Sequence, residues 1–119
     1  MKLTILDRII LKRILPKKSD FVTLRVAREI SKKLTFSTEE LKKYKIRTVR
    51  NPDGSSQIVW DKNAHKQEAD IKLVRIEREI IIKHLEELDV KKLATDNHLD
   101  LYDKIKLFHE ALNNEEKKG

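Results

Sequence analysis

A tight-turn motif in the middle of the chain constrains its fold more than any other feature. The motif, Asn51-Pro52-Asp53-Gly54, holds one of only two glycines in the sequence. Proline fixes φ at the first corner of such a turn, aspartate suits the second corner, and glycine accepts a left-handed backbone. Apolar and β-branched residues flank the motif at 45–50 and 57–61. The segment therefore predicts a β-hairpin in a chain whose other apolar residues recur at helical spacing.

Three helices are predicted before this hairpin, because each has its own start signal. Thr4 caps the first, and Asp7 lies three residues later, where its carboxylate reaches back to free amides. Asp20 precedes the apolar stripe of the second helix. Ser37 and Glu40 form a capping box for a third helix that is short.

Two amphipathic helices are predicted after the hairpin. The first covers roughly 74–93, and the second opens at Thr95 and Asp96 and keeps its apolar stripe to Leu112. Residues 71–73 could add a short third strand, and 113–119 form a polar tail expected to fray. The sequence thus predicts one α+β, mostly helical domain at residues 1–112, with no internal repeat and no long linker.

The excess of positive charge lies in the first half of the chain. Residues 1–61 carry 15 lysines and arginines against 7 acidic residues, a net charge of +8, whereas residues 62–119 carry 12 against 13. The domain therefore divides into a basic half, 1–61, and a nearly neutral half, 62–112. This asymmetry favours an anionic partner, either nucleic acid or an acidic protein surface. The alternative is that lysine-rich helices only keep the chain in solution.

The amino-acid composition excludes most classes of enzyme. A phosphate-cradling loop or a dinucleotide turn needs several glycines close together, and thiol catalysis, zinc ribbons and disulfide scaffolds need cysteine, of which there is none. His109-Glu110 begins like a zinc-binding helix, but Asn113 stands where the second histidine should be. We therefore predict no enzyme, no metal site and no cofactor.

The order of elements in the basic half matches a winged helix, with a supporting helix, a recognition helix and a hairpin wing, and it also matches any compact helical cap followed by a hairpin. The cations that would contact nucleic acid, or an acidic partner, are Lys42, Lys43, Lys45, Arg47 and Arg50. Glu39 and Glu40 oppose this interpretation, because they place negative charge at the end of the recognition helix that approaches the ligand.

Apolar residues indicate a second kind of contact. The long helix has a wider apolar arc than one neighbour covers, so Ile81 and Ile82 are candidates either for the core or for a face shared with a partner or a second copy. Trp60 on the hairpin is a further interface candidate, although a tryptophan there is more often the anchor that packs strands onto helices.

The sequence has no signal peptide or membrane span that we can identify. Charged residues interrupt the apolar start of the chain, and no apolar run is long enough to cross a bilayer. We therefore expect no membrane association and a location in the cytoplasm.

Short motifs over most of the chain share one further pattern. They are Leu6-Asp7-Arg8-Ile9-Ile10-Leu11, Ile14-Leu15-Pro16-Lys17, Phe21-Val22-Thr23-Leu24, Phe36-Ser37-Thr38-Glu39-Glu40, Val59-Trp60-Asp61 and Leu99-x-Leu101-Tyr102-x-Lys104. In them the chain resembles a small family of phage and prophage proteins that has no assigned activity. The resemblance implies a mobile-element origin and the cytoplasm of a host cell, and it transfers no functional residue. We therefore expect a non-enzymatic phage-type accessory protein that binds a host or viral protein or nucleoprotein; the alternative is a winged-helix-like nucleic-acid binder.

Overall fold

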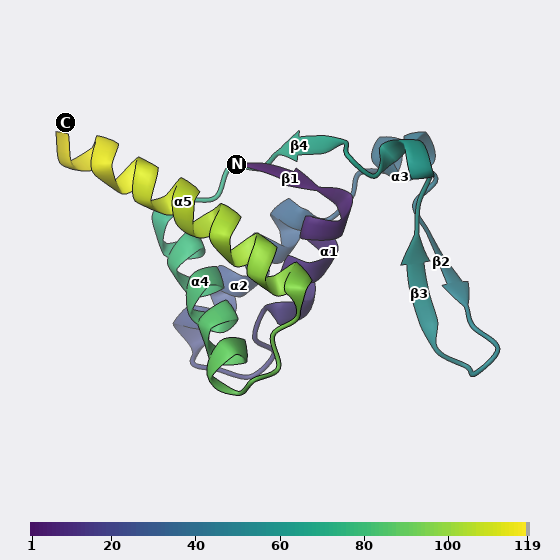
Figure 1. The fold of residues 1–119 in the computed structure, drawn as a ribbon, viewed down its shortest axis with the longest axis horizontal. Helices are drawn as coiled ribbons and strands as arrows, with labels where there is room; N and C mark the ends of the chain where they lie inside the picture. Colours follow the sequence, from purple (N-terminus) through teal and green to yellow (C-terminus); the bar gives the residue numbers. More distant parts are fainter. Residues whose placement is uncertain (119) are drawn as a thin grey trace.

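The chain folds into a helical body and a separate hairpin (Figure 1). The computed structural model describes residues 1–118, with the side chains of residues 1–115. Within them lie five α-helices, four short strands and one 3-10 turn: β1 (Lys2–Thr4), α1 (Ile5–Ile14), α2 (Phe21–Leu34), α3 (Thr38–Lys43), β2 (Arg47–Arg50), β3 (Ser56–Val59), η1 (Lys62–Ala64), β4 (Glu68–Asp70), α4 (Arg75–Val90) and α5 (Asp96–Lys118). The predicted α+β, mostly helical fold is confirmed.

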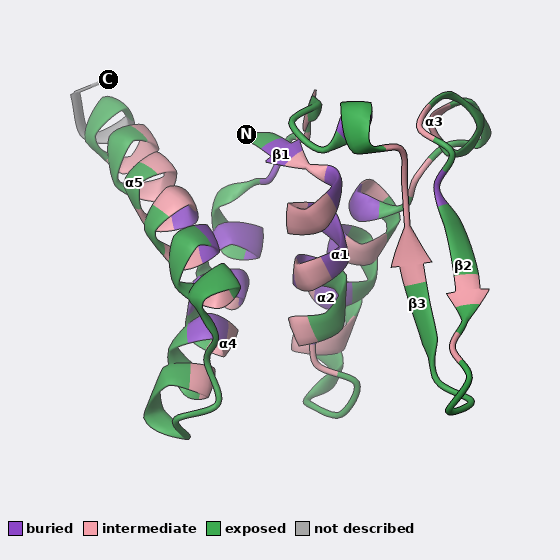
Figure 2. Ribbon diagram, turned by 45° about the vertical axis from the view of Figure 1, so that its right-hand side comes forward, coloured by how far each residue is buried: buried purple, intermediate pink, exposed green. Residues whose placement is uncertain are grey.

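Helices α1, α2, α4 and α5 pack together and enclose the main core. Figure 2 shows the buried residues on the faces that these helices turn toward one another. The largest fully buried side chains come from β1 and from all four helices: Leu3, Leu11, Ile30, Leu34, Ile81, Leu101 and Ile105. Burial of these apolar surfaces supplies most of the driving force for the fold.

The helix starts predicted from sequence are confirmed. Thr4 Oγ1 accepts the Asp7 N–H at 3.1 Å, and the Asp7 carboxylate accepts the Thr4 N–H at 3.0 Å. Asp20 accepts the Thr23 N–H at 2.8 Å at the start of α2. Ser37 and Glu40 form the same reciprocal pair at the start of α3. Each cap satisfies amides that have no partner inside the helix.

The helix ends differ from the expected ones. Helix α4 stops at Val90, because Lys92 adopts φ +58 and the Leu93 N–H bonds back to the Leu88 carbonyl at 2.9 Å. This left-handed closure satisfies the last carbonyls of the helix. Helix α5 continues to Lys118, so 113–118 extend the helix where a frayed tail was expected, and Gly119 lies outside the described residues.

The third strand lies at 68–70 and not at 71–73. β4 pairs antiparallel with β1, Leu3 opposite Ala69, and forms a sheet separate from the hairpin. Residues 71–73 do not continue the strand because Ile71 and Leu73 pack into the helical core.

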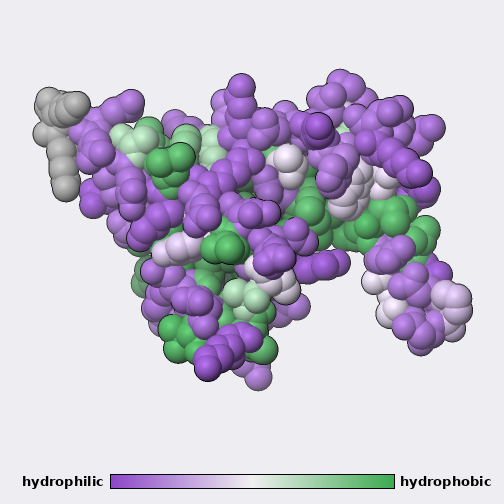
Figure 3. Space-filling view, in the orientation of Figure 1, coloured by the Kyte–Doolittle hydropathy of each residue, from purple (hydrophilic) through white to green (hydrophobic). Residues whose placement is uncertain are grey.

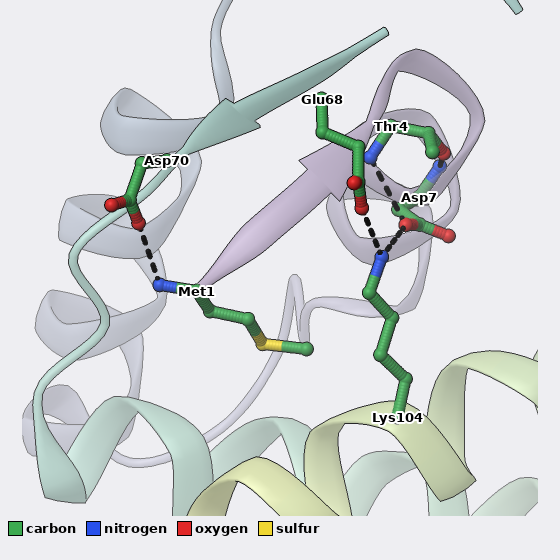
Figure 4. A network of polar contacts seen from close by, with 6 residues as sticks. All are labelled: Met1, Thr4, Asp7, Glu68, Asp70 and Lys104. Carbon is green, nitrogen blue, oxygen red and sulfur yellow. Dashed lines mark hydrogen bonds and ion pairs between the residues drawn. The ribbon is translucent and has the colours of Figure 1, made fainter. Parts of the chain in front are cut away.

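Ion pairs fasten the small β1–β4 sheet to the helices (Figure 4). Lys104 Nζ on α5 lies 2.8 Å from the Asp7 carboxylate and 3.2 Å from that of Glu68. Burial alone would lower the pKa of Lys104, but these two carboxylates outweigh it and raise that pKa. The terminal amine of Met1 donates to the Asp70 carboxylate and to the Ile71 carbonyl, each at 2.9 Å. Asp70, whose pKa is lowered by this contact, thus ties the strand pair to the start of the chain.

Strands β2 and β3 form the predicted hairpin, which stands clear of the helical body (Figures 1 and 3). Arg47 faces Val59 and Arg50 faces Ser56 across the ladder. The turn between them closes through the Asn51 N–H, which donates to Ser55 O at 2.7 Å, and Gly54 adopts φ +89.

The helices follow one another in the order of a winged helix, but α3 does not pack against α2 as a recognition helix packs against its supporting helix. Helix α3 has six residues, none of them buried, and it lies at the outer end of the molecule beside the hairpin (Figure 1). A recognition helix is normally held by packing against its supporting helix. Helix α3 therefore belongs with the hairpin and not with the core.

Replacing Gly54 with alanine should loosen the hairpin only. A left-handed backbone costs a non-glycine residue about 1–2 kcal/mol, and no atom within 4 Å would compensate. We expect amide exchange in 47–50 and 56–59 to accelerate by about tenfold, a factor equivalent to about 1.4 kcal/mol, with exchange in α4 unchanged. Ser56→Ala, at an exposed strand position, is the control and should leave both rates unchanged.

Candidate functional site

The most strongly charged projection of the molecule is the segment from the end of α3 to the end of the hairpin. We define residues 42–60 as the arm. It contains five cationic side chains and one acidic one, a net charge of +4. All five predicted contact residues belong to it and are exposed: Lys42, Lys43, Lys45, Arg47 and Arg50. The structure therefore brings the sequence-predicted cations together on one projection.

The arm's cations lie around it and not on one face. Side chains alternate between the two faces of a strand, so Arg47 and Arg50, three residues apart in β2, point to opposite faces of the hairpin. The Lys43 ammonium lies 5.5 Å from the centre of the Tyr44 ring, at the junction of helix and hairpin.

The junction between α3 and the hairpin is a left-handed helix closure. Lys45 adopts φ +54, and the Ile46 N–H donates to the Leu41 carbonyl at 3.0 Å. Arg47 Nη1 then donates to the Lys45 carbonyl at 2.8 Å. Glycine usually occupies this position because it accepts a left-handed backbone. The backbone of Lys45 is therefore strained.

A small apolar cluster anchors the base of the arm to the body. It joins Ile5 and Ile9 of α1 to Ile46 and Ala64, with the half-buried side chains of Phe36, Tyr44, Ile58 and Trp60 around them. Trp60 thus serves as a structural anchor. Its ring also stacks on His65, with centroids 6.2 Å apart, beside an open cavity of about 450 Å³ that Lys62 helps to line.

Arg8 fixes the segment that leads from the body to the arm. Arg8 is only 3% exposed, and its guanidinium donates to the Leu34 carbonyl at 3.2 Å and the Thr35 carbonyl at 3.0 Å. It also donates two hydrogen bonds, of 2.6 and 3.2 Å, to the Glu40 carboxylate. The Phe36 ring lies 4.3 Å from the guanidinium carbon, at cation–π distance.

Glu40 therefore has two partners. One is Arg8, and the other is the Ser37 N–H at 3.0 Å. The hydrogen bond from Arg8 is the largest of the causes that lower the pKa of the Glu40 carboxyl, and the Ser37 bond adds to it against the effect of burial. Glu40, whose charge opposes ligand binding, is thus paired with Arg8 at a half-buried position.

Ile81 and Ile82 do not lie on a free surface. They are 0% and 6% exposed and belong to the main core, where α1, α2 and α5 surround α4. At these two positions the apolar arc of α4 is therefore covered by this chain's own helices, whereas Ile76 at the start of the helix is half exposed. Ile81 and Ile82 do not fit the interface role considered for them.

The role of Arg8 was not predicted from the sequence. One feature of the sequence points to it: Arg8 is a charged residue between Ile5 and Ile9, on a helix that is apolar around most of its circumference. A charge at such a position needs several partners, because burial of an unpaired charge is very unfavourable. The partners themselves lie 26 to 32 residues away, which no local pattern reveals.

Neither a metal site nor a related protein assigns a function to the arm. Among the side chains of residues 1–115, no three histidine, aspartate or glutamate residues lie close enough together to hold a metal ion. No helix in the described part of the chain has the length and apolar character needed to cross a membrane. Comparisons with protein-family models, curated proteins and solved structures find no match. The resemblance to phage proteins, and the compartment, stay predictions.

Removing the Arg8 guanidinium should destabilise the protein strongly. Arg8→Ala removes a donor from two carbonyls and the charged partner from the Glu40 carboxylate, and we expect a loss of about 3 kcal/mol in the free energy of unfolding. Arg8→Lys keeps the charge but not the planar fork, so its loss should be smaller, about 1–2 kcal/mol. Chemical denaturation measures both. A loss under about 0.5 kcal/mol for Arg8→Ala would contradict this role.

The pair also predicts a dependence of stability on pH. Because folding lowers the pKa of Glu40, its contribution is complete above the unfolded value of about 4.3 and is lost as the pH falls through the lower folded value. The difference in unfolding free energy between the wild type and Glu40→Gln should be constant above about pH 5.5 and shrink below about pH 4. Because the wild type and Glu40→Gln share every other carboxylate, the difference between them reports on Glu40 alone. A difference in unfolding free energy that stays constant to low pH would contradict the Arg8–Glu40 pair.

Proposed function

We propose that the chain is a non-enzymatic binding protein whose arm enters the major groove of duplex DNA. The observation on which the proposal rests is a two-stranded ribbon that stands clear of the body and has cations on both faces. The major groove of B-form DNA admits a two-stranded ribbon, and phosphates line both of its walls. Arg47 and Arg50 point to opposite faces and suit opposite walls.

The rest of the arm fits the same geometry. Lys42, Lys43 and Lys45 precede the ribbon and suit the phosphate backbone beside the groove. The acidic residue of the arm, Asp53, turns its carboxylate onto Ser55, whose hydroxyl and N–H donate to it at 2.6 and 2.9 Å and lower its pKa. The ribbon therefore presents cations along its sides, whereas its one carboxylate is engaged within the turn.

Duplex DNA accounts for the arm better than other anions do. The major groove of an RNA duplex is deep and narrow, so a ribbon cannot enter it. An acidic protein surface would contact one face of the arm and leave the cations of the other face unused. A nucleoprotein that exposes DNA fits the same contacts.

Binding should weaken steeply with salt, and the arm should account for the slope. In fluorescence anisotropy with duplex DNA, the logarithm of the binding constant should fall linearly with the logarithm of salt concentration, and Arg47→Ala/Arg50→Ala should reduce the slope by about 2. Lys72→Ala/Lys83→Ala removes the same charge from exposed positions just before α4 and on it, and serves as the control.

The outcomes separate the proposal from its rivals. An unchanged slope in the control variant supports contact through the arm, whereas an equal loss in both variants indicates net charge alone and contradicts the proposal. Equal affinity for an RNA duplex would also contradict it. Binding of poly-glutamate without any binding of duplex DNA would replace DNA by an acidic protein surface.

Lys45 allows stability and binding to be separated. Lys45→Gly removes one cation and also relieves the left-handed strain, so the free energy of unfolding should rise by about 0.5–1 kcal/mol. Affinity for duplex DNA should nevertheless fall. Thermal denaturation and anisotropy on the same sample test both, and a variant that is more stable and binds as well as the wild type would exclude Lys45 from the interface.

A further inference from the structure

Exposed apolar side chains gather at one end of the helical body, away from the arm. They come from the start of α2, the end of α4 and the start of α5, and they are Phe21, Val22, Val90, Leu93 and Leu99. Phe21 is 79% and Val90 80% exposed. Figure 1 shows the start of α2 and the turn that follows α4 at the same end of the body, with the start of α5 farther along it, and Figure 3 shows apolar atoms around the turn between α4 and α5. Apolar clusters of this kind mark sites of interaction.

Part of this end is hollowed into a groove between α4 and α5. The groove has a volume of about 280 Å³, and its apolar lining includes Leu85, Val90 and Leu99. Glu86 and Asp89 also line it. The Tyr102 hydroxyl donates to Glu86 at 3.1 Å; burial first, and then this carboxylate, raises the pKa of Tyr102. The groove thus combines an apolar floor with a negative rim.

The start of α2 has the complementary character. Phe21 and Val22 are exposed there, and Lys17, Lys18 and Arg25 surround them in sequence, all exposed. Residues 17–28 contain four cations and one carboxylate, a net charge of +3, whereas residues 85–103 contain two cations and six carboxylates, a net charge of −4. We call Phe21 and Val22 the knob. One copy of the chain therefore displays both an apolar knob with positive charge around it and an apolar groove with a negative rim.

We propose that this end binds a second copy of the chain, with Phe21 of each copy in the α4–α5 groove of the other. Because the knob and the groove belong to the same end of one copy, a two-fold rotation can set each knob against the other copy's groove. Such a dimer closes with two identical contacts and does not grow into a filament. The contact uses no residue of the arm, so it does not depend on the proposed DNA binding.

Sedimentation over a range of concentrations tests the dimer. The wild type should reach twice the mass of the 14.1 kDa chain. Phe21→Ser alters the knob and Val90→Glu alters the groove, both at positions so exposed that the monomer should keep its fold. Each should weaken dimerisation more than tenfold, because every dimer loses both of its contacts. Ile76→Ser, a half-exposed change at the other end of α4, is the control and should dimerise like the wild type.

Mixing the two variants distinguishes this dimer from other uses of the surface. A heterodimer of Phe21→Ser and Val90→Glu keeps one intact knob in one intact groove, so the mixture should associate more tightly than either variant alone. A wild type that stays monomeric at every concentration would overturn the proposal, and so would a mixture that associates no better than its components. Circular dichroism of each variant verifies that its helices are retained.

Discussion

The buried guanidinium of Arg8 is the interaction on which the placement of the arm depends. A charge removed from water costs several kcal/mol unless hydrogen bonds replace its hydration. Here all the replacements come from residues 34–40, the segment that joins the end of α2 to α3. The segment is therefore fixed to α1, and α1 is fixed to the core through Leu11. The segment that carries the arm cannot leave α1 without exposing two carbonyls and separating Arg8 from Glu40.

The molecule has two apolar clusters of very different size, and this difference separates its rigid and adaptable parts. The large core holds four helices together, whereas the arm rests on a small cluster around Ile46 and on Arg8. Segments with few buried contacts open at lower free energy than the core does. A hairpin anchored only at its base can adapt to a ligand while the helical body stays folded. Binding segments are commonly drawn from such regions.

Elements that depend on neighbouring residues could be predicted from the sequence, whereas those that depend on contacts between distant residues could not. The caps at Thr4, Asp20 and Ser37 and the turn at 51–54 are set by neighbouring residues, so their patterns predicted the elements correctly. Strand β4 has the sequence Glu-Ala-Asp, which has no strand propensity, and it forms because β1 lies beside it. The arm's cations were found from charge alone, whereas Arg8 and the burial of Ile81 depend on partners distant in sequence.

The division of charge between the two halves of the sequence has a different meaning in space. The basic half supplies two separate surfaces, the arm and the start of α2, and the nearly neutral half contains a local excess of negative charge at 85–103. If the charges at 17–28 and 85–103 face each other across a two-fold dimer, they largely neutralise one another. The arm is then the main exposed excess of positive charge, and each dimer displays two of them. Two linked arms bind one extended anion more tightly than either does alone, provided that both can reach it. The positive charge of the basic half can therefore assemble the dimer through the start of α2 and bind DNA through the arm.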